Sequence, residues 1–169
     1  MIASNALTSM ILWGPPGTGK TTIARLLAEH TDLQFVLLSA IFSGVADLRR
    51  IFEEARAHRD AGRGTLLFVD EIHRFNRAQQ DGFLPVVEDG TVILVGATTE
   101  NPSFTVNAPL LSRSRVLTLV PLDAEALVRV IERALRDEEK GLGKQALVVD
   151  EESLGAIVEF ADGDARKAL

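Results

Sequence analysis

Three glycines and two prolines precede a lysine and two threonines in the stretch WGPPGTGKTTIA, Trp13 to Ala24. From Gly14 to Thr21 the spacing is Gly, four residues, Gly, Lys, then Ser or Thr, which is typical of a loop that wraps phosphate groups. Glycines adopt backbone conformations that other residues avoid, and their N–H groups can surround an anion. Lys20 would neutralise the β- and γ-phosphates of a nucleotide, and the Thr21 hydroxyl would bind Mg²⁺. We expect the nucleotide-binding residues to be Gly14, Pro15, Pro16, Gly17, Thr18, Gly19, Lys20, Thr21 and Thr22.

Two adjacent carboxylates follow an apolar run in LLFVDEIHR, Leu66 to Arg74. A buried strand that ends this way places both carboxylates at the carboxyl edge of a sheet, where such folds bind ligands. Asp70 suits the role of a Mg²⁺ ligand through its water shell, and Glu71 that of the base which polarises an attacking water. Alone, such a pair is more often a helix cap or a turn, so the catalytic interpretation depends on the phosphate loop.

The elements that must position these residues alternate along the chain. Short apolar runs predict strands at 9–13, 34–39, 65–70, 91–99 and 114–120. Apolar residues at helical spacing follow Lys20 and Val45, and a polar helix is expected from about Arg77, with Pro85 near its end. This alternation predicts an α/β fold with a parallel five-stranded sheet covered by helices on both faces.

The pattern changes after Pro121, where two apolar stripes at helical spacing follow Asp123 and Asp150, both good N-caps. We therefore expect two domains, a nucleotide-binding core at 1–121 and the start of a helical lid at 122–169. The chain stops one turn into a third expected helix, at Leu169, so we expect it to be a fragment.

Composition narrows the class of protein. The 169 residues are 46% hydrophobic and 25% charged, which is ordinary for a globular protein, and they include no cysteine for a disulfide or a thiolate metal site. No apolar run approaches a membrane span, and the first nine residues lack the features of a signal peptide, so we expect a cytoplasmic protein with no membrane contact. The net charge of −6 means that any nucleic acid would be bound by local basic patches.

Histidine and arginine side chains give weaker signals. His30, His58 and His73 are too scattered for a metal site, and we expect each at the surface or at a helix end. The arginines between 49 and 63 alternate with acidic residues, which is typical of a solvated helix face. The resemblance given below implies, as an alternative, contact with DNA by the segment SGVADLRR, Ser43 to Arg50, and contact through Arg74 and Arg77 stays open in the same way.

Five motifs stand in the order found in clamp-loader-type AAA+ ATPases: GPPGTGKTT, LFVDEIHRF, GATTENP, LLSRSR and GDAR. More narrowly, DEIHRFNRAQQDGFLPVVEDG together with GATTENPSF resembles the replication-associated recombination protein A family, a group of bacterial DNA-maintenance ATPases with eukaryotic relatives. The resemblance covers almost the whole chain. It implies the P-loop fold of the AAA+ class, with ATP and Mg²⁺ as cofactors.

The resemblance also implies site roles. Lys20, Asp70 and Glu71 keep the roles given above, and Thr99 resembles the first sensor of the γ-phosphate, with Thr98 or Asn101 as alternatives. Arg113 is similar to the arginine finger that serves a neighbouring subunit, and Arg115 is the weaker candidate. Arg166 in GDAR resembles the second sensor, which reaches the γ-phosphate from the lid.

The function implied is ATP-driven maintenance of DNA replication and recombination at stalled forks, in the cytoplasm in association with the nucleoid. Implied partners are forked or junction DNA, single-stranded DNA-binding protein, and further copies of the full-length chain. The alternatives within the class are a Holliday-junction branch-migration motor and a clamp-loader subunit. A different alternative is a structural subunit that binds ATP without turnover, which would need neither Glu71 nor Arg113. Since the family's adenine-binding N-terminal segment and most of its lid are lacking, we expect the fragment to be monomeric and to hydrolyse ATP poorly.

Overall fold

The computed structural model describes residues 7–169, in which five parallel strands form one sheet in the order β2-β3-β4-β1-β5. The predicted α/β class and the parallel five-stranded sheet are confirmed. Residues 1–6, which belong to the segment predicted not to be a signal peptide, lie outside the described part of the chain. The strands are β1 Met10–Trp13, β2 Gln34–Ser39, β3 Thr65–Asp70, β4 Val92–Thr98 and β5 Arg115–Thr118.

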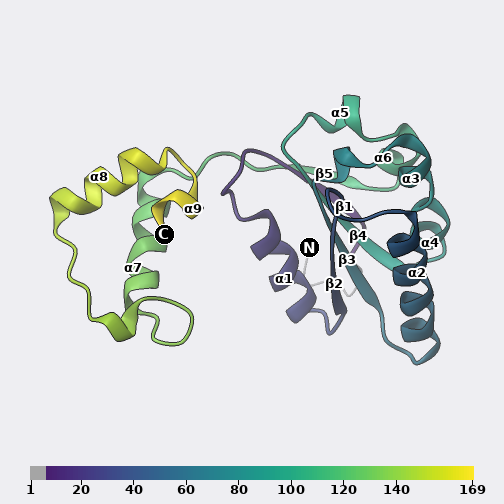
Figure 1. Cartoon of the computed structure of the whole chain (residues 1–169), viewed down its shortest axis with the longest axis horizontal. Helices are drawn as coiled ribbons and strands as arrows, with labels where there is room; N and C mark the ends of the chain where they lie inside the picture. Colours follow the sequence, from purple (N-terminus) through teal and green to yellow (C-terminus); the bar gives the residue numbers. More distant parts are fainter. Residues whose placement is uncertain (1–6) are drawn as a thin grey trace. The chain divides into compact units, whose positions relative to one another are not determined.

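Helices cover both faces of this sheet. Helix α1, Lys20–Glu29, lies on one face, and α2, Val45–Asp60, lies on the other with the short helices that follow β3 (Figure 1). Each long helix buries only part of the apolar stripe that its sequence spacing predicts, since Leu26 in α1 and Val45 in α2 are exposed. The buried residues are Ala24, Leu27 and Ala28 in α1, and Leu48, Ile51, Phe52 and Ala55 in α2.

The central strands are buried on both sides, which explains why their sequences are continuously apolar rather than alternating. All four residues from Leu66 to Val69 in β3 are 0% exposed. Gly96 in β4 allows an unusually close approach, because a Cβ there would come within 2.7 Å of Ile11 and 3.0 Å of Ile72. The missing side chain therefore makes room for the segment that directly follows β3.

The connection between β3 and β4 differs from the prediction. A single helix from about Arg77 with Pro85 near its end is wrong, because the structure has two helices, α3 Arg77–Asp81 and α4 Leu84–Glu88. Pro85 lies in the first turn of α4, where its missing N–H costs nothing, whereas inside a helix it would remove a hydrogen bond.

Two short helices between β4 and β5 were not anticipated. These are α5 Pro102–Thr105 and α6 Ala108–Ser112, and each begins with an asparagine cap followed within two residues by a proline. Asn101 accepts a hydrogen bond from the N–H of Ser103, and Asn107 accepts one from Leu110. An Asn cap with Pro in the first turn is a helix-start signal, but the helices are too short to show an apolar period.

The described residues form two compact units. The sheet unit holds the chain up to Gly14 and from Lys20 to Thr118, and the second unit holds Pro15–Gly19 with Leu119–Leu169. The second unit contains helices α7 Ala124–Arg136, α8 Glu151–Ala161 and α9 Ala165–Ala168 and the 3₁₀ turn η2 Gly143–Gln145. None of the helices within residues 7–169 has the length and apolar character needed to span a bilayer.

The predicted N-caps of the second unit are confirmed. Asp123 accepts a hydrogen bond from the N–H of Ala126, and Asp150 accepts one from Ser153. The Ser153 hydrogen bonds hold the pKa of the Asp150 carboxyl below its ordinary value, so the cap is ionised at neutral pH. The assignment of this unit as the start of a lid domain remains a proposal.

Phe83 packs between α2 and the segment that follows β3, with its ring centroid 5.5 Å from Phe52 and 5.8 Å from Phe75. Because it is fully buried, Phe83→Ala should lower the free energy of unfolding by about 3–5 kcal/mol. Phe42 is 87% exposed, so the matched variant Phe42→Ala should change it by less than about 0.5 kcal/mol. Chemical denaturation of both variants measures the difference, and equal losses would contradict this packing.

Candidate nucleotide-binding and hydrolysis site

The carboxyl ends of β1, β4 and β3 lie side by side and bring the predicted chemistry to one edge of the sheet. Trp13 in β1 pairs with Thr98 in β4, and the N–H of Gly14 donates to the Thr98 carbonyl at 3.1 Å. Strand β3 flanks β4 on its other side and ends at Asp70. The end of β4 therefore lies between the strand that starts the phosphate loop and the strand that carries the carboxylates.

The phosphate loop itself contains a tight turn. The Thr18 hydroxyl donates to the Pro15 carbonyl at 3.0 Å, and the Ala165 N–H donates to the Gly17 carbonyl at 3.2 Å. Gly17 and Gly19 have φ angles of +72° and +84°, in the left-handed region that side chains disfavour. The glycine spacing is thus required by the backbone of the turn.

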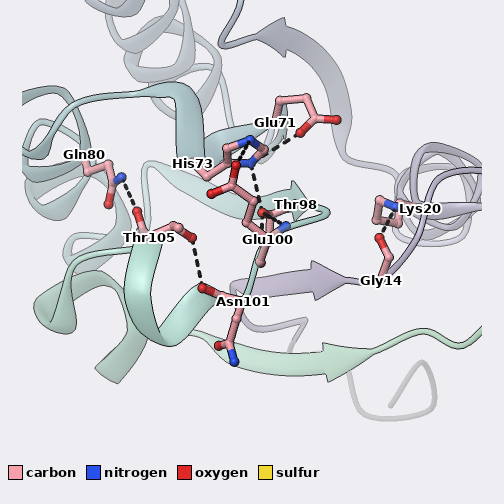
Figure 2. Close-up of polar contacts among 9 residues, drawn as sticks. All are labelled: Gly14, Lys20, Glu71, His73, Gln80, Thr98, Glu100, Asn101 and Thr105. Carbon is pink, nitrogen blue, oxygen red and sulfur yellow. Dashed lines mark hydrogen bonds and ion pairs between the residues drawn. The ribbon is translucent and has the colours of Figure 1, made fainter.

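Helix α1 begins at Lys20, so Lys20, Thr21 and Thr22 form its first turn, where the positive end of the helix dipole favours an anion. The Lys20 ammonium donates to the Gly14 carbonyl at 2.8 Å, across the mouth of the loop (Figure 2). This contact links the glycine that begins the motif to its lysine, and Thr21, the next residue, is partly exposed.

Asp70 and Glu71 differ in backbone conformation. Asp70 is the last residue of β3, and its carbonyl still accepts a ladder hydrogen bond from Ala40 at 3.0 Å. Glu71 has φ 55° and ψ 46°, a left-handed conformation that costs a residue with a side chain about 1 kcal/mol. It precedes the 3₁₀ turn η1, Ile72–Arg74, which is anchored by buried Ile72. Because the chain leaves the direction of β3 at Glu71, the carboxylates of Asp70 and Glu71 lie in different positions.

Of the two expectations for His73, a helix-end position is met, since it lies in the last turn of η1, but a surface position is wrong. Its side chain is only 4% exposed, and its ring lies among Glu71, Thr98 and Glu100 (Figure 2). Nδ1 is 2.9 Å from the Thr98 hydroxyl and 3.3 Å from Glu71 Oε2, and Nε2 is 3.3 Å from Glu100 Oε1. Sequence analysis missed this residue because its partners Thr98 and Glu100 lie 25 and more positions further along the chain.

The residues near the predicted first sensor have different environments. The Thr98 side chain is buried and engaged with His73 and Glu100, whereas Thr99 follows the end of β4 and is exposed. Asn101 caps α5 with its side chain. Thr99 is thus the one of the three with an exposed side chain and no such structural task, and its sensor role remains a prediction.

Buried Gln80 joins the segment after β3 to the segment after β4. Its side-chain amide donates to the carbonyls of Phe75 and Thr105 at 3.0 and 2.9 Å, and its carbonyl accepts from the Asn107 N–H at 2.8 Å (Figure 2 shows the Thr105 bond). Because each of these contacts pairs a backbone group, the glutamine fixes both segments in place.

Arg113, the predicted finger, ends α6 and folds back onto its own subunit. Its guanidinium pairs with Glu88 at 2.5 Å and donates to the Pro109 carbonyl at 2.8 Å. The side chain is 40% exposed, and an exposed ion pair of this kind contributes only about 0–1 kcal/mol. Release of Arg113 toward another molecule therefore costs little. Arg115, the weaker candidate, begins β5 and is exposed.

Arg166, the predicted second sensor, lies in α9 of the second unit. Its guanidinium pairs with Asp164 at 3.4 Å, and Asp164 also caps α9 by accepting from the Arg166 N–H at 2.8 Å. Desolvation acts to raise the pKa of Asp164, but the hydrogen bonds and charge of Arg166 outweigh it and leave that pKa below its ordinary value. The guanidinium is mostly exposed.

These residues fit ATP and Mg²⁺. The left-handed glycines, the start of α1 and the Lys20 ammonium supply what a polyphosphate needs, and Thr21 and Asp70 supply hard oxygen ligands. Within residues 7–169 no group of three or more His, Cys, Asp and Glu side chains is arranged so that it could hold a metal ion by itself. Mg²⁺ takes one or two protein ligands and completes its shell with waters and phosphate oxygens.

A parallel sheet with a glycine-rich loop before Lys20, and with two carboxylates at the end of the strand two places away from the one that leads into the loop, defines a P-loop nucleoside triphosphatase. The family described as "ATPase family associated with various cellular activities (AAA)" matches residues 10–122. The chain belongs to this family, and it is an ATPase domain that uses ATP with Mg²⁺.

Sequence relatives identify a smaller group of proteins within this family. The chain is 52% identical to Replication-associated recombination protein A from Escherichia coli K12 and to that from Coxiella burnetii, over 99% of its own length and 38% of theirs. It is 45% identical to the ATPase WRNIP1 of Dictyostelium discoideum, over its whole length and 19% of that protein. The predicted resemblance is confirmed, and the chain spans less than half the length of these relatives.

Solved structures agree on the fold. The Thermotoga maritima RuvB Holliday junction branch migration motor superposes with a TM-score of 0.77 at 29% identity, over 96% of this chain and 52% of that one. This protein represents the alternative that the sequence left open. Its identity to the chain is lower than that of the recombination protein A relatives.

Two substitutions separate binding from chemistry. In the full-length protein, Lys20→Ala should abolish ATP binding, because the loop loses its ammonium. Glu71→Gln keeps the shape but accepts no proton, so ATP should bind while turnover falls by about 10²- to 10⁴-fold. Calorimetry and phosphate release measure the two effects. Unchanged affinity in the first variant, or normal turnover in the second, would contradict the assigned role.

Proposed function

We propose that this chain is the ATP-hydrolysing core of a factor that maintains DNA replication and recombination at stalled forks. The observation that carries the proposal is the 52% identity to Replication-associated recombination protein A across 99% of the chain. Since the chain covers 38% of that relative, the DNA substrate, the partners and the assembly belong to the proposal for the full-length protein.

In the proposed mechanism the chain's residues first hold the nucleotide. N–H groups between Gly17 and Thr22 surround the phosphates, and the Lys20 ammonium leaves the Gly14 carbonyl to neutralise the β- and γ-phosphates. Thr21 and Asp70 would hold Mg²⁺, Asp70 through water. When bound, the ion neutralises charge on the phosphate oxygens.

Glu71 then acts on the attacking water. Its carboxylate accepts a proton as the water oxygen bonds to the γ-phosphorus, and the bond from that phosphorus to the β–γ bridging oxygen breaks, which yields ADP and phosphate. Thr99 would sense the γ-phosphate from the end of β4, and Arg166 from the lid.

Arg113 would act on the neighbouring subunit's nucleotide. Its low-cost contact with Glu88 supports this role, since a phosphate is a stronger partner than an exposed carboxylate. We therefore propose that the full-length protein works as a homo-oligomer.

We place the protein in the cytoplasm, associated with the nucleoid, with DNA as its main partner and single-stranded DNA-binding protein as a second one. Because the net charge of the chain is −6, DNA contact requires local basic groups. Exposed Arg49, Arg74 and Arg77 lie on segments that follow the carboxyl ends of β2 and β3, and they are the candidates in this chain.

Forked DNA should raise ATP turnover by the full-length protein several-fold, and added salt should reduce the stimulation as phosphate contacts weaken. Phosphate release with forked, single-stranded, duplex and four-way-junction DNA measures this, and Lys20→Ala is the inactive control. A response confined to four-way junctions would favour a branch-migration motor. No response to any DNA would contradict the proposal.

Arg113→Ala should leave ATP binding intact while turnover falls by about 10³- to 10⁵-fold, the range found for arginine fingers. Lys20→Ala spoils its own site but keeps a finger to lend. Mixing the two inactive full-length variants should therefore restore part of the activity, and dilution should remove it.

The control for this mixture is direct proof that mixed oligomers form, for example by co-purification of differently tagged variants. If mixed oligomers form and stay inactive, Arg113 does not act across the subunit boundary. Arg115→Ala, mixed in the same way, then tests the other candidate.

A further inference from the structure

His73 is a buried, polar and titratable side chain that the proposed mechanism does not use. It follows the proposed base by two positions on the 3₁₀ turn η1, whose neighbours Ile72 and Phe75 are 0% and 3% exposed. The backbone of the turn is thus anchored by apolar burial on either side of His73. A ring with a 4% exposed side chain on an anchored turn has a defined position.

The contacts of the ring run in two directions. Nδ1 faces Glu71 Oε2 at 3.3 Å and the Thr98 hydroxyl at 2.9 Å, and Nε2 faces Glu100 Oε1 at 3.3 Å (Figure 2). The imidazole therefore connects the proposed base to the end of β4, the strand that also receives the first hydrogen bond of the phosphate loop.

The hydrogen-bond partner of the ring is the Thr98 hydroxyl at Nδ1, whereas the carboxylates of Glu71 and Glu100 lie 3.3 Å from Nδ1 and Nε2, within ion-pair distance. The Thr98 hydroxyl faces the Glu100 carbonyl at 3.2 Å and the Glu100 N–H at 3.0 Å. When its hydrogen goes to that carbonyl, its oxygen is left to accept from His73 Nδ1.

We propose that His73 is a positioning residue for Glu71. It binds Oε2 of the carboxylate and directs the other oxygen, Oε1, to accept the proton of the attacking water. Such a group that orients a base is a recurrent arrangement in hydrolytic sites. Because the same ring contacts Thr98 and Glu100, a shift at the end of β4 changes the position of the base. The inference rests on the proposed function, since it takes Glu71 as the base.

The test uses the full-length protein with ATP and DNA. His73→Ala should lower kcat by about 10²-fold, the loss expected from a misplaced catalytic group, while the KM and the Kd for ATP change less than about twofold. His73→Gln keeps an amide N–H donor and should recover part of kcat. His30→Ala, at an exposed histidine near the end of α1, is the matched control and should keep normal turnover.

A merely structural role for His73 predicts a different result. It would lower the melting temperature and the amount of active protein, and the loss of activity would then be the same in any background. Positioning acts through the carboxylate alone, so adding His73→Ala to Glu71→Gln should cause no further loss of turnover. If His73→Ala fails to fold, Glu100→Gln, at a half-exposed side chain, tests the same ring and should lower kcat by a smaller factor.

The outcomes separate the inference from the proposed function. If Glu71→Gln is inactive and His73→Ala is as active as the unchanged protein, or more active, the positioning role is wrong and the function stands. Equal losses from His73→Ala with and without Glu71→Gln would also overturn it. If Glu71→Gln keeps normal turnover, the proposed base itself is wrong.

Discussion

The close packing of Ile72 against the bare backbone of Gly96 is the constraint on which the site depends. It seats η1 directly on β4, so the chain must turn away from the sheet at Glu71, in a left-handed conformation. The same approach brings His73 within hydrogen-bond distance of Thr98. The backbone strain at Glu71 and the polar contacts around it thus have the same cause, which is the apolar contact between Ile72 and Gly96.

The strands of the sheet and the phosphate loop could be predicted from sequence because their signals are local. Apolar runs predict strands, and the runs at 34–39 and 65–70 coincide with β2, at an edge of the sheet, and with β3, which is buried. Two of the glycines before Lys20 have a left-handed backbone conformation, which residues with a side chain disfavour. Asp123 and Asp150 were identified as caps for the same reason, since a cap is defined within three residues.

The remaining features depend on contacts between distant parts of the chain. From the sequence, Gln80 is expected to be an ordinary polar residue of a helix. It is buried because it hydrogen-bonds to Thr105 and Asn107, which follow β4 in the sequence. His73 reads as exposed because Thr98 and Glu100 are remote in sequence. Helices α5 and α6 could not be predicted from the spacing of apolar residues, because four or five residues are too few to form an apolar stripe.

The left-handed backbone at Glu71 has a consequence for how this position tolerates change. Glycine would adopt the same conformation without strain, and asparagine with less of it, so either is a better choice for the fold than glutamate. Both lack the carboxylate that the proposed chemistry needs. Selection for thermal stability alone would therefore drive this residue toward inactive sequences, and the glutamate persists only where turnover is selected together with folding.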